Sequence, residues 1–199
     1  MNIKFAIVVV SGVFISGCAA TGAIQVATAA ASTALEIVGL VKPSEAKPEA
    51  LKEVPLNIFA GAGLNTDAQG RSNAVVVKLY RLRNNASFLG TSYETLMDPA
   101  REKATLGQDL LDVREVMLVP GQKLEFKEKL PADTAFLAVA ALFRAPSTER
   151  WRYTFPVDAA NAKGVIVGVH GCALTVSQGN VSGAKINDVS SLTGVRCQP

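Results

Sequence analysis

From residue 54 onward, hydrophobic and polar positions alternate in the manner of β-strands. A strand with one buried face places apolar side chains at every second position. This alternation occurs in four segments, at residues 56–60, 75–80, 124–130 and 151–157. Further strands are indicated at 113–119, before the Pro120-Gly121 turn, and at 135–143, 165–169 and 173–176. Eight short strands with turn residues between them predict an all-β fold, a β-sandwich.

Two of these segments carry further detail. Residues 135–143 are apolar on both faces, which is typical of a central strand covered on both sides. In the segment 75–80, Val75, Val77 and Leu79 are expected to face the core, while the alternate positions face outward. Lys78 is among those outward positions.

Helix signals interrupt the strand pattern between residues 91 and 107. Thr91 is followed three residues later by Glu94, a spacing that fits a capping box. Asp98-Pro99 then has the form of an N-cap followed by proline at the first helical position. We therefore expect a short helical insertion that ends near Gly107.

The first 53 residues follow a different pattern, which predicts an export signal and a tether. Lys4 precedes an apolar run of 11 residues at 5–15, and the small residues Ser16 and Gly17 lie directly before Cys18. A spanning helix needs about 20 apolar residues, so a transmembrane anchor is the weaker interpretation. The alternative is an ordinary signal peptide cut elsewhere, with Cys18 incidental.

These signals divide the chain into four parts. Residues 1–17 form the signal peptide and 18–53 form a tether. Within the tether, the Ala-rich segment 22–41 is able to form a helix, because Ala has the highest helix propensity. The charged residues 42–53, which include two prolines, are typical of a linker. The sandwich occupies 54–177, and 178–199 is a mostly small and polar tail.

Residues 15–18, Ile-Ser-Gly-Cys, resemble the bacterial lipobox, with Ile in place of the usual Leu. The resemblance implies a thioether-linked diacylglycerol on Cys18, cleavage before it, and acylation of the new N-terminus. Each buried methylene of an acyl chain contributes about 0.8 kcal/mol, so several chains anchor a protein stably. This covalent lipid is the only added group we expect, and no cofactor or metal is indicated.

The net charge and the cysteines exclude one class of function and predict a disulfide. The formal net charge is +3, and removal of residues 1–17, whose only charge is Lys4, leaves +2. That charge is too small and too dispersed to indicate nucleic-acid binding. With lipid on Cys18, the remaining cysteines are Cys172 and Cys197, and a disulfide between them persists outside the cytoplasm. Two free thiols are the alternative.

The sequence shows no clear catalytic or metal-binding pattern. His170 is the single histidine, and it lacks the partner spacing of a zinc site. A strand-end histidine with a local hydrogen bond is the simpler interpretation. No G-x-S-x-G motif occurs, so no nucleophile elbow is indicated. We therefore expect neither an enzyme nor a small-molecule substrate.

The loop at residues 61–73 is the most informative segment. Its 13 residues exceed the usual two to five of a hairpin connection, and long ordered loops on a rigid scaffold often bind partners. A flexible connector is the alternative. In the binding interpretation, Leu64 supplies an exposed apolar contact and Arg71 a charged one. The candidate partner-binding residues are Gly61, Gly63, Leu64, Asn65, Asp67 and Arg71.

Several segments together resemble the TssJ family, the outer-membrane lipoproteins of the type VI secretion system. They are residues 75–82 after Leu64-Asn65, then Pro120-Gly121, then 139–144 and Trp151-Arg152. The resemblance covers about residues 18–176 in order. It implies a transthyretin-like β-sandwich with a helical insertion.

The same resemblance implies a non-enzymatic role on the periplasmic face of the outer membrane. The implied partner is the periplasmic domain of the inner-membrane protein TssM, contacted through the first long inter-strand loop. A pilotin-like lipoprotein of another envelope assembly is an alternative. A hydrolase on a transthyretin-like scaffold is another, although those enzymes use several histidines and this chain has only His170.

Overall fold

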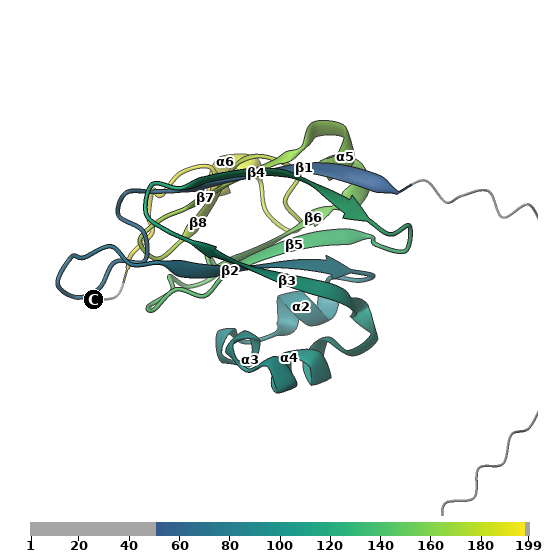
Figure 1. Ribbon diagram of the computed structural model, residues 1–199, viewed down its shortest axis with the longest axis horizontal. Coiled ribbons are helices and arrows are strands. Elements are labelled where there is room, and N and C mark those ends of the chain that lie inside the picture. The colour runs from purple at the N-terminus through teal and green to yellow at the C-terminus, as the bar shows by residue number, and fades with distance from the viewer. Residues whose placement is uncertain (1–50, 198–199) are drawn as a thin grey trace, which may run out of the picture. The chain divides into compact units, whose positions relative to one another are not determined.

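In the computed structural model, which describes residues 51–197, eight strands form two four-stranded sheets packed face to face (Figure 1). The first sheet has the order β4 (Lys123–Leu130), β1 (Lys52–Ala60), β7 (Val165–Val169), β8 (Leu174–Gln178). The second has the order β3 (Leu110–Leu118), β2 (Val75–Leu82), β5 (Phe136–Ala141), β6 (Arg152–Pro156). The predicted β-sandwich is thus confirmed. The predicted signal peptide, Cys18 and the predicted tether up to residue 50 lie outside the described residues.

β1 lies in the interior of the first sheet and is paired on both edges. It runs antiparallel to β4 and parallel to β7, so that Ile58 lies opposite Leu124 on one side and Val167 on the other. Its alternation is the predicted one, because Leu56 and Ile58 are fully buried between the sheets. In the second sheet, β5 is a central strand with both faces covered, as its apolar sequence predicted.

The helical insertion covers the outer face of the second sheet (Figure 1). It comprises α2 (Ala86–Gly90), α3 (Tyr93–Met97) and α4 (Pro99–Leu106), followed by a 3-10 turn, Gly107–Asp109. Asp98 caps α4 as predicted, and its carboxylate accepts hydrogen bonds from the backbone N–H groups of Ala100 and Arg101 at 3.0 and 3.2 Å.

The capping box predicted at Thr91 is wrong. Ser92 is the N-cap of α3, and its hydroxyl accepts from the Thr95 backbone N–H at 3.3 Å. Thr91 instead follows α2, where its hydroxyl donates to the Ser87 carbonyl at 2.6 Å. No sequence pattern indicated α2, and that helix places Thr91 at a C-terminus rather than at an N-terminus.

A buried ion pair attaches the insertion to the sheet. Lys78 on β2 is only 2% exposed, and its ammonium lies 2.9 Å from a carboxylate oxygen of Glu102 on α4. The same ammonium donates to the Leu96 carbonyl at 2.9 Å, and the Tyr80 hydroxyl donates to Glu102. The prediction that Lys78 faces solvent is therefore wrong, because the insertion covers that face of β2.

A second cation fastens α2. The Arg152 guanidinium donates to the carbonyl oxygens of Phe88, Leu89 and Thr91, at the C-terminal end of the helix. The last carbonyls of a helix lack partners within the helix, and a cation there also complements the helix dipole. β6 and the insertion are held together by this contact.

The end of the chain is more structured than its composition predicted. Val157 begins a helix, α5 (Val157–Lys163), rather than ending a strand, and the tail contains α6 (Ile186–Val189). Val181 and Val189 are buried, and the tail is joined to β6 by a hydrogen bond from the Ser182 N–H to the Thr154 carbonyl at 2.8 Å. Within residues 51–197, no helix is long and apolar enough to cross a membrane.

Candidate functional site

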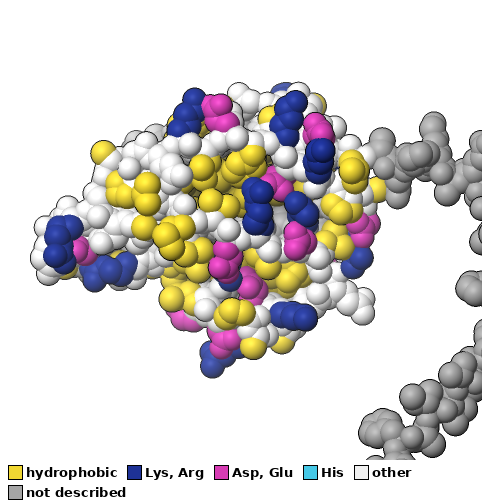
Figure 2. All heavy atoms as spheres, viewed as in Figure 1, with side chains coloured by type: hydrophobic (Ala, Val, Ile, Leu, Met, Phe, Trp, Pro, Cys, Tyr) yellow, Lys and Arg dark blue, Asp and Glu magenta, His cyan; other side chains and the backbone are white. Residues whose placement is uncertain are grey.

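The loop at residues 61–73 projects from one end of the sandwich, between β1 and β2 (Figure 1). Basic side chains lie at this projecting end (Figure 2). The outer part of the loop is a closed turn organised by Asp67. The Asp67 carboxylate accepts from the N–H groups of Gln69 and Arg71, at 3.0 and 2.9 Å, and from the Arg71 side chain at 2.8 Å.

These bonds favour the ionised carboxyl, so they hold the pKa of Asp67 below its ordinary value, with the backbone N–H of Arg71 as the largest cause. Gly70, at φ 76°, supplies the left-handed residue of the turn. The loop has an internal hydrogen-bond network, which favours the binding interpretation over a flexible connector.

Leu64 does not lie where the sequence analysis expected it. The prediction of an exposed apolar contact is wrong, because Leu64 is fully buried and belongs to the hydrophobic core. An isolated apolar residue in a polar loop can either face a partner or turn inward, and here the base of the loop turns it inward. Its carbonyl also accepts from the Asn73 N–H at 2.9 Å, which closes the loop at its base.

Asn65 is also a structural residue of the loop base. It is 9% exposed, and its side chain donates to the Ala74 carbonyl at 2.7 Å and accepts from the Arg144 N–H at 2.8 Å. Its φ of 45° is in the left-handed region, which Asn tolerates better than most residues. The side-chain amide expected to meet a partner is therefore already satisfied within the protein.

The loop rests against the turn between β7 and β8. The Asn65 N–H donates to the His170 carbonyl at 3.1 Å, and the Thr66 N–H donates to the Gly171 carbonyl at 3.2 Å. Closer to the strand, the Gly61 N–H donates to Val169 at 2.8 Å. The glycine at 63 is exposed, and its carbonyl accepts from the Thr66 hydroxyl at 2.9 Å.

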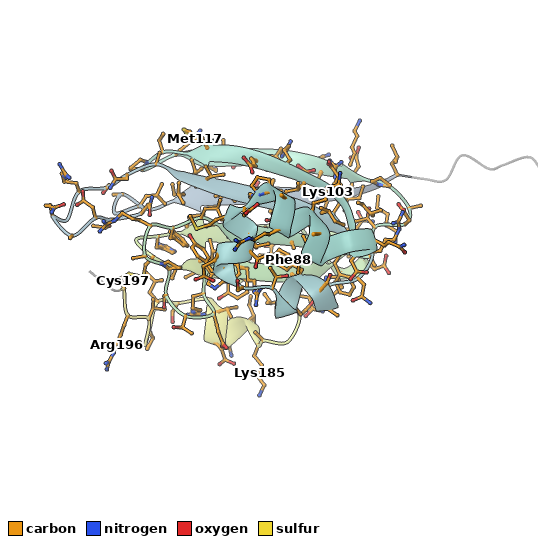
Figure 3. The ribbon with its side chains drawn as sticks, turned by 90° about the horizontal axis from the view of Figure 1, so that it is seen from below. Phe88, Lys103, Met117, Lys185, Arg196 and Cys197 are labelled. Atoms are coloured by element: carbon orange, nitrogen blue, oxygen red, sulfur yellow. A yellow bond between two sulfur atoms is a disulfide. The ribbon has the colours of Figure 1, made fainter. Side chains whose placement is uncertain are left out.

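The predicted disulfide is confirmed and lies next to this contact. Cys172 is bonded to Cys197, with Cα atoms 5.5 Å apart. The Cys172 carbonyl also accepts from the Ser147 N–H at 2.9 Å. Arg196 and Cys197 lie at the same end of the sandwich as the projecting loop (Figure 3). This end is therefore built from two loops, one turn and the end of the tail.

The six predicted site residues thus fall into two groups. Gly63 and Arg71 are exposed, and the Arg71 side chain is 74% exposed. Gly61, Leu64, Asn65 and Asp67 instead shape or support the loop. Sequence reasoning missed Arg144, an exposed residue after β5 that Asn65 holds beside the loop. No local signal could have found it, because the two residues are 79 positions apart.

His170 has the local role that the sequence predicted. Its Nε2 lies 2.8 Å from the Thr175 hydroxyl, and burial lowers the pKa of its imidazole. A side chain at Gly168 would collide with this pair, since its Cβ would lie 2.4 Å from the Thr175 hydroxyl. Among the residues that the structure describes, no group of three or more His, Cys, Asp or Glu could hold a metal ion.

The model of the family described as "Type VI secretion lipoprotein, VasD, EvfM, TssJ, VC_A0113" matches residues 52–172 of the chain. This match covers 172 − 52 + 1 = 121 of the 199 residues, which is more than half of the sequence. Among curated proteins, none matches the chain.

Three solved structures are similar over the sandwich. A chain of a type VI membrane complex is 29% identical, with a TM-score of 0.59, over 65% of this chain and 100% of that one. A chain from the structure of the type VI secretion protein TssM C-terminal domain from EAEC is 28% identical, with a TM-score of 0.54, over 64% and 98%. The lipoprotein TssJ1 from Pseudomonas aeruginosa is 24% identical, with a TM-score of 0.57, over 68% and 100%, which supports the fold alone.

Proposed function

The chain belongs to the TssJ family of type VI secretion lipoproteins, and from this we propose that it docks the periplasmic domain of the inner-membrane component TssM while acyl chains on Cys18 hold it on the periplasmic face of the outer membrane. The similarity to a chain in the TssM C-terminal domain structure supports the choice of partner. The proposed role is mechanical: the protein links the secretion system's membrane complex to the outer membrane.

The observation that carries the docking proposal is the prefolded loop at residues 61–73. Its turn is closed by Asp67, and its base is fixed by Asn65 and by the buried side chain of Leu64. Binding through a flexible segment costs free energy for ordering each residue, whereas a preorganised loop avoids most of that cost. A loop with this much internal bonding suits a permanent contact in an assembly.

The contact surface of the loop differs from the one expected from sequence. The exposed part contains Ala62, Gly63, Gln69 and Arg71, while Leu64 and Asn65 act from below. A partner would therefore meet backbone and polar groups with one exposed guanidinium. Contacts of this kind depend on shape and hydrogen bonding more than on burial of a large apolar side chain.

Calorimetric titration tests the docking proposal. The mature chain with Cys18→Ser, which is soluble because it takes no lipid, is titrated with the purified periplasmic domain of TssM. We expect Gln69→Ala/Arg71→Ala to weaken binding by about tenfold or more, because few residues dominate most interfaces. Arg83→Ala is the matched control, since its exposed ion pair with Asp133 lies at the other end of β2.

Thermal melting of each variant separates loss of binding from loss of folding. The two loop substitutions are exposed and should leave the melting temperature nearly unchanged. Unchanged affinity in the double variant, with wild-type binding intact, would place the interface elsewhere on the sandwich.

Membrane attachment is tested on the full-length protein in cells. Cys18→Ser should abolish incorporation of labelled palmitate and release the protein from the membrane fraction, because the acyl chains have no other proposed attachment point. Ala19 follows the lipidated cysteine, and by resemblance to lipoprotein sorting in enteric bacteria it allows export to the outer membrane. Recovery of the wild-type protein only in inner-membrane fractions would contradict that location.

A further inference from the structure

Two exposed arginines lie on separate segments that are joined at the projecting end of the sandwich. Arg71 lies on the loop, and Arg144 lies on the segment that follows β5. The two segments are joined directly, because the side chain of Asn65 accepts a hydrogen bond from the Arg144 N–H at 2.8 Å. Both arginines are exposed, and basic atoms are prominent at this end of the molecule (Figure 2).

Arg144 differs from most exposed arginines of residues 51–197 in having no ion pair, a property that it shares with Arg196. The exposed residues Arg83, Arg101 and Arg114 and the partly buried Arg81 each lie within 3.3 Å of an Asp or Glu carboxylate. Among the ion pairs of residues 51–197, Arg144 takes part in none. Its guanidinium is thus available at a place where the backbone is held firmly.

The Arg71 guanidinium remains partly free to bind a partner. Its Nε donates to Asp67, yet its side chain is 74% exposed while the Asp67 side chain is only 9% exposed. The carboxylate is also taken up by two backbone N–H groups of the turn. The acid therefore lies under the turn, and the outer surface presents the cation.

We infer that Arg71 and Arg144 together form a cationic docking surface for an acidic patch on the protein partner. This inference rests on the proposed function, because it assigns a chemical character to the surface that the partner presents to the loop. Guanidinium groups bind carboxylates through two parallel hydrogen bonds, which adds geometric specificity to the attraction. Complementary charge across an interface also speeds association.

The comparisons favour a protein partner over an anionic membrane, because the chain belongs to a family of secretion-system lipoproteins and is similar to a chain in a TssM C-terminal domain structure. The segment that continues to the N-terminus joins the sandwich at Lys52, where β1 begins, while the loop leaves the other end of β1 at Ala60. At about 3.4 Å per residue, β1 separates the two points by roughly 27 Å. The cationic surface therefore lies at the opposite end of β1 from the point where the chain enters the sandwich.

Asn65 acts as a positioning residue for both arginines. It fixes Arg144 through its side-chain oxygen and closes the loop that carries Arg71 through its side-chain nitrogen, which donates to Ala74. Loss of this amide would let the two cations move relative to each other. We therefore expect Asn65→Ala to weaken binding even though the side chain makes no contact of its own with a partner.

Charge reversal tests the inference, with the same titration of the Cys18→Ser chain against the TssM periplasmic domain. Arg144→Glu should weaken binding by about tenfold or more, mainly through slower association. The deficit should shrink when salt reduces the Debye length below about 10 Å. Arg83→Glu is the control, because it makes the same change of charge at the other end of β2 and should leave affinity unchanged. Arg144→Gln should give a smaller loss than Arg144→Glu.

The possible outcomes are distinguishable. If the wild-type chain binds the domain and Arg144→Glu binds equally well, the inference is wrong and the proposed function stands. If the wild-type chain does not bind at all, both are wrong. An anionic membrane is the other possible source of negative charge, and sedimentation with vesicles containing phosphatidylglycerol tests it. If Arg144→Glu abolishes binding to the vesicles but leaves binding to the TssM domain unchanged, the assignment of a protein partner is wrong.

Discussion

Replacing Lys78 by Met tests whether the insertion is held by a buried ion pair. Lys78 is 2% and Glu102 4% exposed, and the ammonium lies 2.9 Å from the carboxylate and 2.9 Å from the Leu96 carbonyl. Met preserves most of the side-chain volume and removes only the charge and its donors. The Glu102 carboxylate would then stay buried with the Tyr80 hydroxyl as its remaining partner. Breaking a buried pair in this way costs about 3–5 kcal/mol.

The double variant Lys78→Met/Glu102→Leu separates the pair from its surroundings. Replacing both charges by apolar groups is often neutral, because the desolvation cost disappears together with the attraction. Here the Tyr80 hydroxyl and the Leu96 carbonyl would lose partners, at about 1–3 kcal/mol for each buried group left unsatisfied. We therefore expect the double variant to be no less stable than Lys78→Met, and its loss to fall well short of the sum of the two single losses.

Denaturant unfolding measures these differences in the free energy of unfolding, provided that the variants share the wild type's dependence of that free energy on denaturant concentration. Lys103→Met is the matched control, because Lys103 lies on the same helix as Glu102 but is exposed, and its loss should stay within about 0.5 kcal/mol. A loss below about 1 kcal/mol for Lys78→Met would contradict the reasoning. The reasoning would also be contradicted if the stability losses of Lys78→Met and Glu102→Leu were strictly additive in the double variant, because residues in contact are expected to couple.

Three further outcomes follow from other parts of the structure. Leu64→Ala should lower the free energy of unfolding by about 2–5 kcal/mol, measured by denaturation, because Leu64 is a core residue; a neutral result would restore the exposed-anchor interpretation. Cys172→Ser should cost roughly 3 kcal/mol, the stabilisation expected from a bond between residues 25 positions apart, and chemical reduction of the wild type should match it. Burial lowers the pKa of His170, so as pH falls the unfolded chain binds a proton at this residue before the folded chain does. The neutral, buried imidazole therefore contributes stability above about pH 6.5, and this contribution is lost as pH falls below that value. The melting temperature of His170→Gln should accordingly fall less than that of the wild type between pH 7 and 5.

The strands were predictable from sequence because their signal is local. In β1 the alternate residues Val54, Leu56 and Ile58 are buried, and the apolar run of β5 correctly indicated a strand covered on both faces. The Asp98-Pro99 helix start was equally local, since its hydrogen bonds reach only two and three residues ahead. The disulfide followed from counting cysteines, which left a single pair.

The errors arose where a distant element decides the environment of a residue. Lys78 has the sequence context of a solvated lysine, and its burial depends on Glu102, which lies 24 positions away on the insertion. Leu64 is one apolar residue in a polar loop, so no periodicity indicates which way it points. Arg144 joins the docking end only through its backbone bond to Asn65, a contact between loops that pattern reasoning does not address.

The interior place of β1 has a consequence for the order in which the chain acquires its structure. A chain that crosses a membrane with its amino terminus first delivers β1 early, yet its two partners begin only at Lys123 and Val165. Until Val165 emerges, the parallel edge of β1 has no strand to pair with, and such open edges favour aggregation. Pairing between distant segments is also slow, because loop closure precedes any gain from contacts. Cys197 follows all eight strands in the chain, so the disulfide forms after the last strand has emerged. Under the proposed export, β1 is thus the first strand of the sandwich to emerge and is fully paired only after Val165 follows, so an export pathway that kept β1 unfolded until then would protect its open edge.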